Sequence, residues 1–361
     1  MRSIPPDSIR HRGALSNPDN RYDALRRDDV DDGWYTADEQ LPPLATTLAI
    51  DHSRSIISYN QSPDVPFDRS INPYRGCEHG CVYCFARPSH AWLGLSPGLD
   101  FETQLFYKPD AVRLLRNELA ARNYRCAPLA LGINTDAYQP VEHRLGLTRQ
   151  LLEVLVETRH PVTIVTKSAL IERDIDLLSE LARHRLVQVA LSVTTLDHAL
   201  SRNLEPRSAV PRRRLQTIRT LQAAGIPVSV LIAPLIPFLN DHELEHILEQ
   251  VHQAGALQAG YVMLRLPHEL KDLFREWLQR HVPLKAAHIM NRIADLHDGK
   301  TYDARFGQRM RGSGPYADLI AQRYRRAMQR LGFNGLPALD CTQFTPPRDP
   351  HNTQIEMFDS R

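Results

Sequence analysis

Three cysteines lie within eight positions in the stretch NPYRGCEHGCVYCFAR, residues 72–87. Cys77, Cys81 and Cys84 follow the spacing C-x3-C-x2-C. Thiolates are soft ligands for zinc and for iron–sulfur clusters, and three of them on one tight loop are suited to hold a single inorganic centre. The question is therefore which centre this loop binds.

A structural zinc ion takes four protein ligands, usually as two pairs, and the chain carries no second C-x2-C and no histidine pair at zinc-finger spacing. His79 is a possible fourth ligand, but its place between two ligating thiols makes a closed tetrahedron difficult. A ferredoxin sequence would read C-x2-C-x2-C with a later Cys-Pro, which is also absent. These comparisons favour a [4Fe-4S] cubane held by three thiolates, with its fourth iron open for chemistry. A structural metal loop is the alternative.

The whole chain sets limits on the class of protein. Its 361 residues are 42% hydrophobic, enough to bury a large core, and 44 Lys and Arg against 42 Asp and Glu leave a formal charge of +2. This balance gives no global attraction to nucleic acid or to an anionic membrane. The sequence has no apolar run of membrane-spanning length and no secretory signal at its start, and five cysteines are too few for a disulfide scaffold. We therefore expect a cytoplasmic protein without a membrane partner.

Short apolar runs alternate with amphipathic stretches through the middle of the chain. Strands are predicted near 70–73 and over 129–135, 162–168, 187–195, 228–236 and 261–267, and helices over 145–159, 169–184, 213–225 and 241–255. This alternation predicts an α/β fold with a parallel sheet and right-handed crossovers. Six strands are fewer than the eight of a complete barrel, so we expect a partial (β/α)6 TIM-like barrel.

The composition divides the chain into four regions. We expect an extended or disordered N-terminal arm over 1–45 that contributes little to the core, the barrel over 46–267, a helical C-terminal annex over 268–335 and a polar, proline-interrupted tail over 336–361.

The cysteine spacing, on a loop after the first strand of an α/β barrel, resembles that of the radical S-adenosylmethionine (SAM) enzymes. The resemblance covers about residues 65–267. It implies that Cys77, Cys81 and Cys84 ligate a [4Fe-4S] cluster whose open iron binds the amino and carboxylate groups of SAM. It also implies that SAM is cleaved reductively to a radical that abstracts hydrogen from a substrate, with electrons from a donor such as flavodoxin or ferredoxin. Tyr83 corresponds to the aromatic residue that these enzymes place against adenine.

Polar residues follow the predicted strands, at the edge of a parallel sheet where function usually lies. Asp136 follows the second strand, Lys167 ends the third, and Ser192 and Thr194 end the fourth. In radical SAM proteins these strand ends meet the ammonium, carboxylate and ribose of SAM, so we expect the four residues to contact the cofactor. The alternative for the serine and threonine is capping of the next helix.

The segment NLEPRSAVPRRRLQTI, residues 203–218, adds Glu205, Arg207 and Arg214 beside that edge. With TDAYQPVE and NPYRGC, it resembles the subfamily related to spore photoproduct lyase. We expect Glu205 and Arg214 to contribute to the cofactor site, since a guanidinium suits the SAM carboxylate. A solvated basic helix start is the alternative.

One departure from that subfamily concerns a thiol. Spore photoproduct lyases place a hydrogen-donating cysteine at the end of the second strand, where this chain has Asn134 and Thr135. The thymine-dimer reaction is therefore not expected here. Cys126 lies before the strand, which favours a small buried hydrophobic role. Cys341 is interpreted as a structural thiol or as a donor that reaches the barrel mouth.

Two segments raise the question of macromolecular partners. Residues 305–330 carry seven arginines and one acid with two interleaved tyrosines, which indicates either a contact with DNA or RNA or a solvated helix over the barrel. QIEMF, residues 354–358, resembles the peptide by which bacterial repair proteins bind the sliding clamp.

The prediction is a radical SAM enzyme, with nucleic acid as the leading substrate class for repair or modification, and a protein or small molecule as the alternative. The alternative from a different class of protein is a non-catalytic metal-binding module that recognises nucleic acid.

Overall fold

The computed structural model describes residues 11–23 and 44–347. Within them, a seven-stranded sheet has the order β10-β9-β8-β7-β6-β3-β2, in which β2 is antiparallel to β3 and the other pairs are parallel. The strands are β2 (Ile57–Tyr59), β3 (Arg69–Ile71), β6 (Leu129–Leu131), β7 (Val162–Thr166), β8 (Val187–Ser192), β9 (Val228–Leu235) and β10 (Gln258–Met263). The expected partial (β/α)6 barrel is confirmed.

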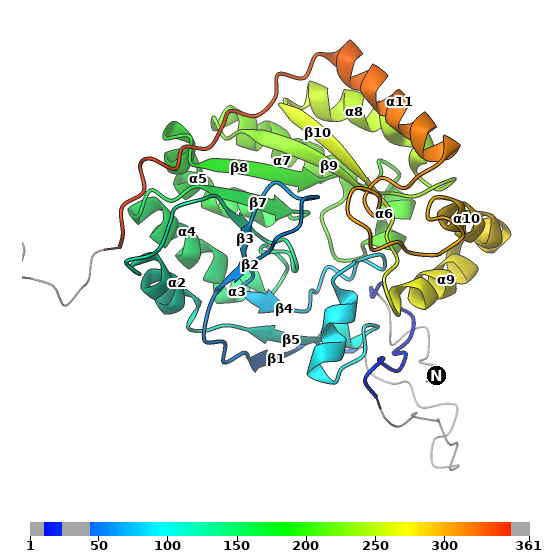
Figure 1. Cartoon of the computed structure of the whole chain (residues 1–361), viewed down its shortest axis with the longest axis horizontal. Coiled ribbons are helices and arrows are strands. Elements are labelled where there is room, and N and C mark those ends of the chain that lie inside the picture. Colours follow the sequence, from blue (N-terminus) through cyan, green and yellow to red (C-terminus); the bar gives the residue numbers. More distant parts are fainter. Residues whose placement is uncertain (1–10, 24–43, 348–361) are drawn as a thin grey trace, which may run out of the picture.

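Helices connect the parallel strands and cover the outer face of the sheet (Figure 1). Those of the barrel are α2 (Ala111–Leu119), α3 (Glu142–Leu145), α4 (Leu147–Glu157), α5 (Ile175–Arg183), α6 (His198–Leu204), α7 (Pro211–Ala223) and α8 (Leu244–Gln253), with 3-10 turns at Ala169–Asp174 and Asp241–Glu243. Three further helices, α9 (Leu270–His281), α10 (Pro283–Asp295) and α11 (Pro315–Leu331), follow β10 and form the expected annex.

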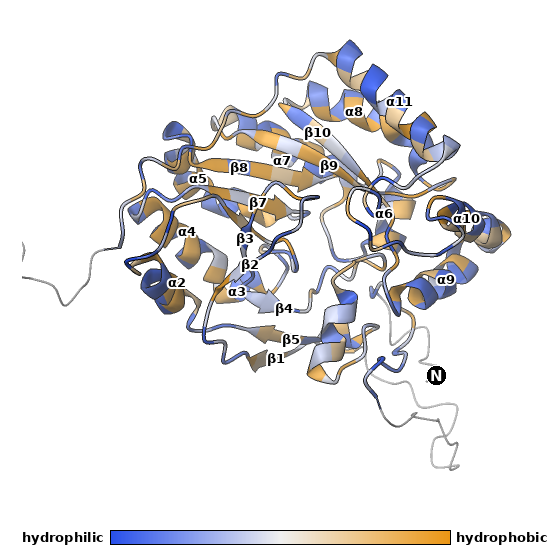
Figure 2. Cartoon of the chain, viewed as in Figure 1, coloured by the Kyte–Doolittle hydropathy of each residue, from blue (hydrophilic) through white to orange (hydrophobic). Residues whose placement is uncertain are grey.

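The core forms because every second side chain of the central strands is apolar and buried, whereas Thr163, Gln188 and Ser229 lie on the opposite face. The sequences VTIVT of β7, VQVALS of β8 and VSVLIAPL of β9 are rich in β-branched residues, which suit a buried parallel sheet. Helix α4 buries Leu151, Leu152 and Leu155 against this sheet, while its polar side chains face outward. Figure 2 shows the same division, with apolar strands inside and polar helix faces outside.

A second, smaller sheet lies beside the start of the barrel and was not expected. It has the order β1-β5-β4, formed by β1 (Thr47–Ile50), β5 (Gln104–Tyr107) and β4 (Tyr74–Arg75). A short helix α1 (Asp100–Thr103) and a 3-10 helix (Arg87–Leu93) lie between β4 and β5. Strands of two to four residues are too short to show a period in the sequence. The cysteine loop therefore follows β4 of the small sheet, and two residues separate the end of β3 from the start of β4.

Several strand boundaries differ from the expectation, and two of these differences bear on the site. Strand β6 ends at Leu131, so Asn134, Thr135 and Asp136 lie on the loop that follows it. Strand β10 covers 258–263 instead of 261–267, which places Arg265 beyond the strand end. Apolar residues that continue into a loop extend the predicted strand, because periodicity cannot separate a buried strand from a buried loop.

The two edges of the large sheet are linked by the chain after α10. Backbone N–H of Met263, at the end of β10, donates to the carbonyl of Met310 at 2.9 Å. Asp64, in the connection between β2 and β3, accepts from the backbone N–H of Gly307 at 2.7 Å and pairs with Arg309. Residues 307–310 therefore join the last strand to the first hairpin.

The amino-terminal residues that the structure describes, 11–23, pack against the barrel. Ala14 is 1% exposed and contacts the buried side chains of Leu99 and Leu273. This part of the predicted arm does contribute to the core, unlike the expectation, while the division of the chain into four regions stays a prediction. Across 11–23 and 44–347, we find no helix with the length and apolar character needed to cross a bilayer.

Candidate active site

The three cysteines lie on tight turns directly after β4. Glycines at 76 and 80 adopt φ of 76° and 67°, a region in which a side chain is strained, and the backbone N–H of Cys84 donates to the carbonyl of Cys81 at 3.2 Å. Cys77 and Cys81 are buried, Cys84 is half-buried, and all three are free thiols. The turns therefore gather three thiols on one short loop at the barrel edge.

The electrostatics of the loop suit a cationic inorganic centre. Burial raises the pKa of the Cys77 and Cys81 thiols, and the charge of Asp136 raises that of Cys77 further. Buried thiols of this kind ionise when a metal stabilises the thiolate. In residues 11–23 and 44–347, no three His, Cys, Asp or Glu side chains form a group that could hold one metal ion. A cubane makes a different demand, because each thiolate binds its own iron.

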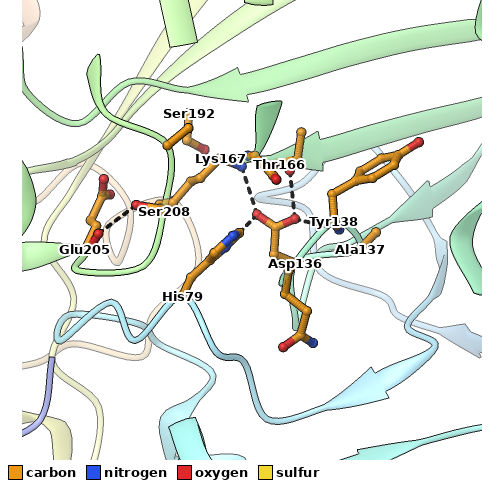
Figure 3. Close-up of polar contacts among 12 residues, drawn as sticks. His79, Asp136, Ala137, Tyr138, Thr166, Lys167, Ser192, Glu205 and Ser208 are labelled. Carbon is orange, nitrogen blue, oxygen red and sulfur yellow. Dashed lines mark hydrogen bonds and ion pairs between the residues drawn. The ribbon is translucent and has the colours of Figure 1, made fainter. Parts of the chain in front are cut away.

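His79, the candidate fourth ligand for zinc, faces Asp136 instead. Its Nδ1 lies 3.2 Å from Asp136 Oδ2, and the two carboxylate oxygens also accept from Thr166 Oγ1 at 2.7 Å and from the backbone N–H groups of Lys167 at 2.8 Å and Tyr138 at 2.9 Å (Figure 3). Burial opposes the charge of Asp136, but His79 and these donors outweigh it and lower its pKa to about 2. Asp136 is thus a buried anion that ties the cysteine loop to the ends of β6 and β7.

A second network joins the cysteine loop to the end of β8. The Tyr83 hydroxyl donates to Glu205 and lies 3.1 Å from Thr194 Oγ1, which itself donates to Glu205 Oε1 at 2.7 Å. Glu205 forms a buried ion pair with Arg214, and both side chains are at most 2% exposed. Three residues predicted at separate places along the chain therefore share one carboxylate.

Every nitrogen of the Arg214 guanidinium donates a hydrogen bond within the protein. Besides Glu205, it donates to the carbonyl of Ser192 at 3.0 Å, the carbonyl of Ala209 at 2.7 Å and Ser208 Oγ at 2.8 Å. Arg207, the other arginine of this segment, pairs with Glu78 at 3.1 Å. In this arrangement Arg214 orients Glu205 and the end of β8.

Lys167 links the two networks, because its backbone N–H donates to Asp136 and its ammonium lies beside the Tyr83 ring. Its Nζ lies 5.8 Å from the centre of the Tyr83 ring and close enough to Cys81 to act on the pKa of that thiol. Among the residues that the structure describes, this ammonium makes no hydrogen bond and no ion pair. It is an unpaired cation beside the cysteine loop. All seven residues predicted to bind the cofactor lie in this region: Tyr83, Asp136, Lys167, Ser192, Thr194, Glu205 and Arg214.

Sequence reasoning missed a second cation at the mouth. The Arg265 guanidinium lies 4.7 Å from the centre of the Phe85 ring, next to Cys84, and makes no hydrogen bond or ion pair with any described residue. Burial lowers its pKa, with the charge of Arg309 acting in the same direction. The signal for it in the sequence is a charged residue directly after the apolar run YVML. The predicted strand 261–267 places Arg265 in its interior instead of at its end.

The arginine-rich stretch 305–330 is largely satisfied within the protein. Arg323 pairs with Glu245 and Arg330 with Glu249, both on α8, while Arg309 pairs with Asp64. Arg305 pairs with two nearby aspartates. Four of the seven arginines thus have carboxylate partners, and this leaves less positive charge for a phosphate backbone. The clamp-like peptide 354–358 lies outside the described residues.

Cys126 and Cys341 lie together, away from the cysteine loop. Burial raises the pKa of Cys126 to about 12, and the neighbouring Cys341 thiol adds to this shift. The backbone N–H of Asp340 donates to the carbonyl of Arg185, just before β8, and that of Thr345 to the carbonyl of Thr158, before β7. Cys341 is therefore near the amino ends of the strands, opposite the barrel mouth.

Relatives of known sequence match more than half of this chain. The chain is 38% identical to an uncharacterized protein of Mycobacterium tuberculosis over 235 residues, which are 64% of this chain and 68% of the relative. It is 27% identical to an uncharacterized protein of Methanocaldococcus jannaschii over 225 residues, or 62% of this chain and 80% of that one.

Solved structures share the fold. A spore photoproduct lyase mutant with bound AdoMet and dinucleoside spore photoproduct is 13% identical, with a TM-score of 0.55 over 80% of each chain. Spore photoproduct lyase complexed with dinucleoside spore photoproduct is 14% identical, with a TM-score of 0.53 over 80% of each chain. The family model described as Radical SAM superfamily matches residues 71–251, which run from the last residue of β3 through the cysteine loop and into α8. This chain belongs to the radical SAM superfamily.

Proposed function

We propose that this protein is a radical SAM enzyme that binds a [4Fe-4S] cluster through Cys77, Cys81 and Cys84 and abstracts hydrogen from a substrate carbon. When bound, the cluster supplies the electron that cleaves the SAM sulfonium. The observation that carries the proposal is the placement of three free thiols on one tight loop, beside an unpaired lysine ammonium.

We assign a different part of SAM to each residue around the loop. We assign Lys167 to the SAM carboxylate, because an unpaired and partly desolvated ammonium gains most from an anionic partner. Tyr83 is assigned to adenine, and Ser192 and Thr194 to the ribose. Glu205 is held by Arg214, so it fixes Tyr83 and Thr194 in place.

Asp136 has a positioning role in this assignment. Its carboxylate joins His79 of the cysteine loop to the backbone N–H of Lys167. The aspartate therefore sets the distance between the thiols and the lysine that is assigned to SAM.

The second unpaired cation bears on the substrate. Arg265 has five N–H donors, no partner among the described residues, and an aromatic neighbour, Phe85, that is 44% exposed. We infer that the substrate carries an anionic group that reaches this guanidinium. Nucleotides meet this requirement, and so do carboxylate-bearing small molecules and acidic side chains of proteins.

The function is tested by anaerobic reconstitution with iron and sulfide, followed by addition of SAM and dithionite. We expect about four irons per chain and formation of methionine and 5′-deoxyadenosine. Replacement of any one of the three cysteines by alanine should abolish 5′-deoxyadenosine formation, whereas the Cys126→Ala variant serves as the matched control. Stoichiometric zinc without SAM cleavage would instead identify a non-catalytic metal-binding module.

A further inference from the structure

The amino-terminal residues Arg12, Gly13 and Ala14, here called the N-terminal strap, lie directly on the cysteine loop. A Cβ atom at Gly13 would be 1.6 Å from the carbonyl oxygen of Gly80, which lies between Cys77 and Cys81 in the sequence. Real atoms do not approach so closely, so any side chain at this position must displace the strap or the loop. Gly13 is not among the glycines with a positive φ, so the backbone conformation does not require a glycine here. The close approach to Gly80 does.

A buried carboxylate anchors the strap. Glu102, which is 0% exposed, accepts from the backbone N–H of Gly13 at 2.9 Å and from that of Ala14 at 2.8 Å. Arg12 adds three contacts, from Nη1 to the carbonyl of Glu102 at 3.0 Å and from Nη2 to the carbonyl of Leu44 at 2.6 Å and to Thr46 Oγ1 at 3.3 Å. A carboxylate removed from water needs such donors, so the strap and Glu102 stabilise one another.

The same carboxylate connects the strap to the loop through Arg87. Arg87 is also 0% exposed and forms an ion pair with Glu102. Its guanidinium donates to the carbonyl of Cys81 at 2.8 Å and to that of Gly80 at 3.1 Å. The backbone of the loop between the first and second thiols is therefore fixed from two sides, by the strap and by the arginine.

We propose that the N-terminal strap is a positioning element that holds the cysteine loop in shape and shields Cys77 and Cys81 from solvent. The role in cluster retention rests on the proposed function, whereas shielding of the thiols does not depend on a cluster. Ala14, the last residue of the strap, precedes Cys77 by 63 positions in the sequence, so the strap acts through tertiary contacts alone.

The first measurement uses the full-length protein without a cluster, under anaerobic reducing conditions. The rate of alkylation by iodoacetamide is followed at each cysteine by peptide mass spectrometry. We expect Gly13→Ala and Arg12→Ala to raise the rates at Cys77 and Cys81 at least tenfold. Gly260→Ala is the matched control, because its new Cβ would lie 3.7 Å from the nearest atom. Unchanged rates in both strap variants would overturn the proposal.

Cys126 and Cys341 serve as internal standards for global unfolding. If Gly13→Ala also accelerates their alkylation, the variant has lost its fold and the decision passes to Arg12→Ala, which removes contacts without creating a clash. Selective acceleration at the loop supports the strap, and acceleration at all cysteines in the Arg12 variant rejects it.

The second measurement uses reconstituted protein and follows the anaerobic release of iron to a ferrous chelator. We expect release at least tenfold faster from Gly13→Ala than from the wild type or Gly260→Ala. Equal release rates would overturn the role in cluster retention. Wild-type protein that binds no cluster, yet shields Cys77 and Cys81, would refute the proposed function and leave the shielding role established.

Discussion

The Lys167 ammonium lies 5.8 Å from the centre of the Tyr83 ring. Among the residues that the structure describes, it makes no hydrogen bond and no ion pair. Lys167 directly follows β7 and Tyr83 belongs to the cysteine loop, so more than 80 positions separate the two residues in the sequence. Their approach creates a site in which an anion is favoured and an apolar ring forms one wall.

The Lys167→Met variant should bind SAM at least tenfold more weakly than the wild type, a loss of about 1.4 kcal/mol. The reason is that methionine keeps the length and apolar stem of lysine but removes the charge assigned to the SAM carboxylate. Calorimetric titration of reconstituted protein with SAM measures the effect. Lys300→Met, at an exposed position, is the control. Equal affinities in the two variants would refute the assignment of Lys167.

Breaking the Glu205–Arg214 ion pair at the end of β8 should destabilise the protein. Arg214→Met leaves a carboxylate buried without its partner and should lower the free energy of unfolding by about 3 kcal/mol or more. The double variant Glu205→Gln with Arg214→Met removes both charges and should lose less than the single variant. Urea denaturation of the wild type, the single variant and the double variant measures these free energies of unfolding. A double variant that is less stable than Arg214→Met would contradict the expected coupling.

Inorganic phosphate should bind at Arg265 with millimolar affinity, because the half-buried guanidinium has no carboxylate partner among the described residues. Line broadening of the phosphorus NMR signal reports the binding. The Arg265→Gln variant should weaken it at least tenfold, whereas Arg275→Gln, which removes an exposed arginine paired with Asp272, should not. Equal broadening in Arg265→Gln and the wild type would exclude Arg265 as an anion site.

His160 should make stability depend on pH. The buried imidazole lies 2.7 Å from the Tyr124 hydroxyl, and burial lowers its pKa from 6.5 to about 4. Because the unfolded chain takes up the proton first, stability is full above pH 6.5 and falls by about 3 kcal/mol as the pH falls to 4.

Urea denaturation at pH 7.5 and pH 5 tests this dependence. The His160→Gln variant should lose part of the difference in unfolding free energy between the two pH values. His242→Gln, at an exposed position, should keep it. A His160 variant with the same pH dependence as the wild type would show that other groups cause the acid sensitivity.

The local pattern of residues was sufficient for part of the site. The spacing of Cys77, Cys81 and Cys84, and the position of Lys167 at a strand end, are visible in the sequence because a short loop and a parallel strand are both local structures. The order of apolar runs likewise predicts the barrel, since buried parallel strands must alternate with helices in such a fold.

Only the tertiary structure decided which of these residues act on one another. It directed Arg214 to Glu205, placed Arg265 beside Phe85, and brought Gly13 onto Gly80. Each of these contacts joins segments whose separation carries no periodic signal, and each depends on packing, burial and pairing with charges from elsewhere in the chain. For that reason the amino-acid sequence by itself determined the type of chemistry and the architecture that supports it, whereas the folded chain decided which charges are satisfied internally and which are left for ligands.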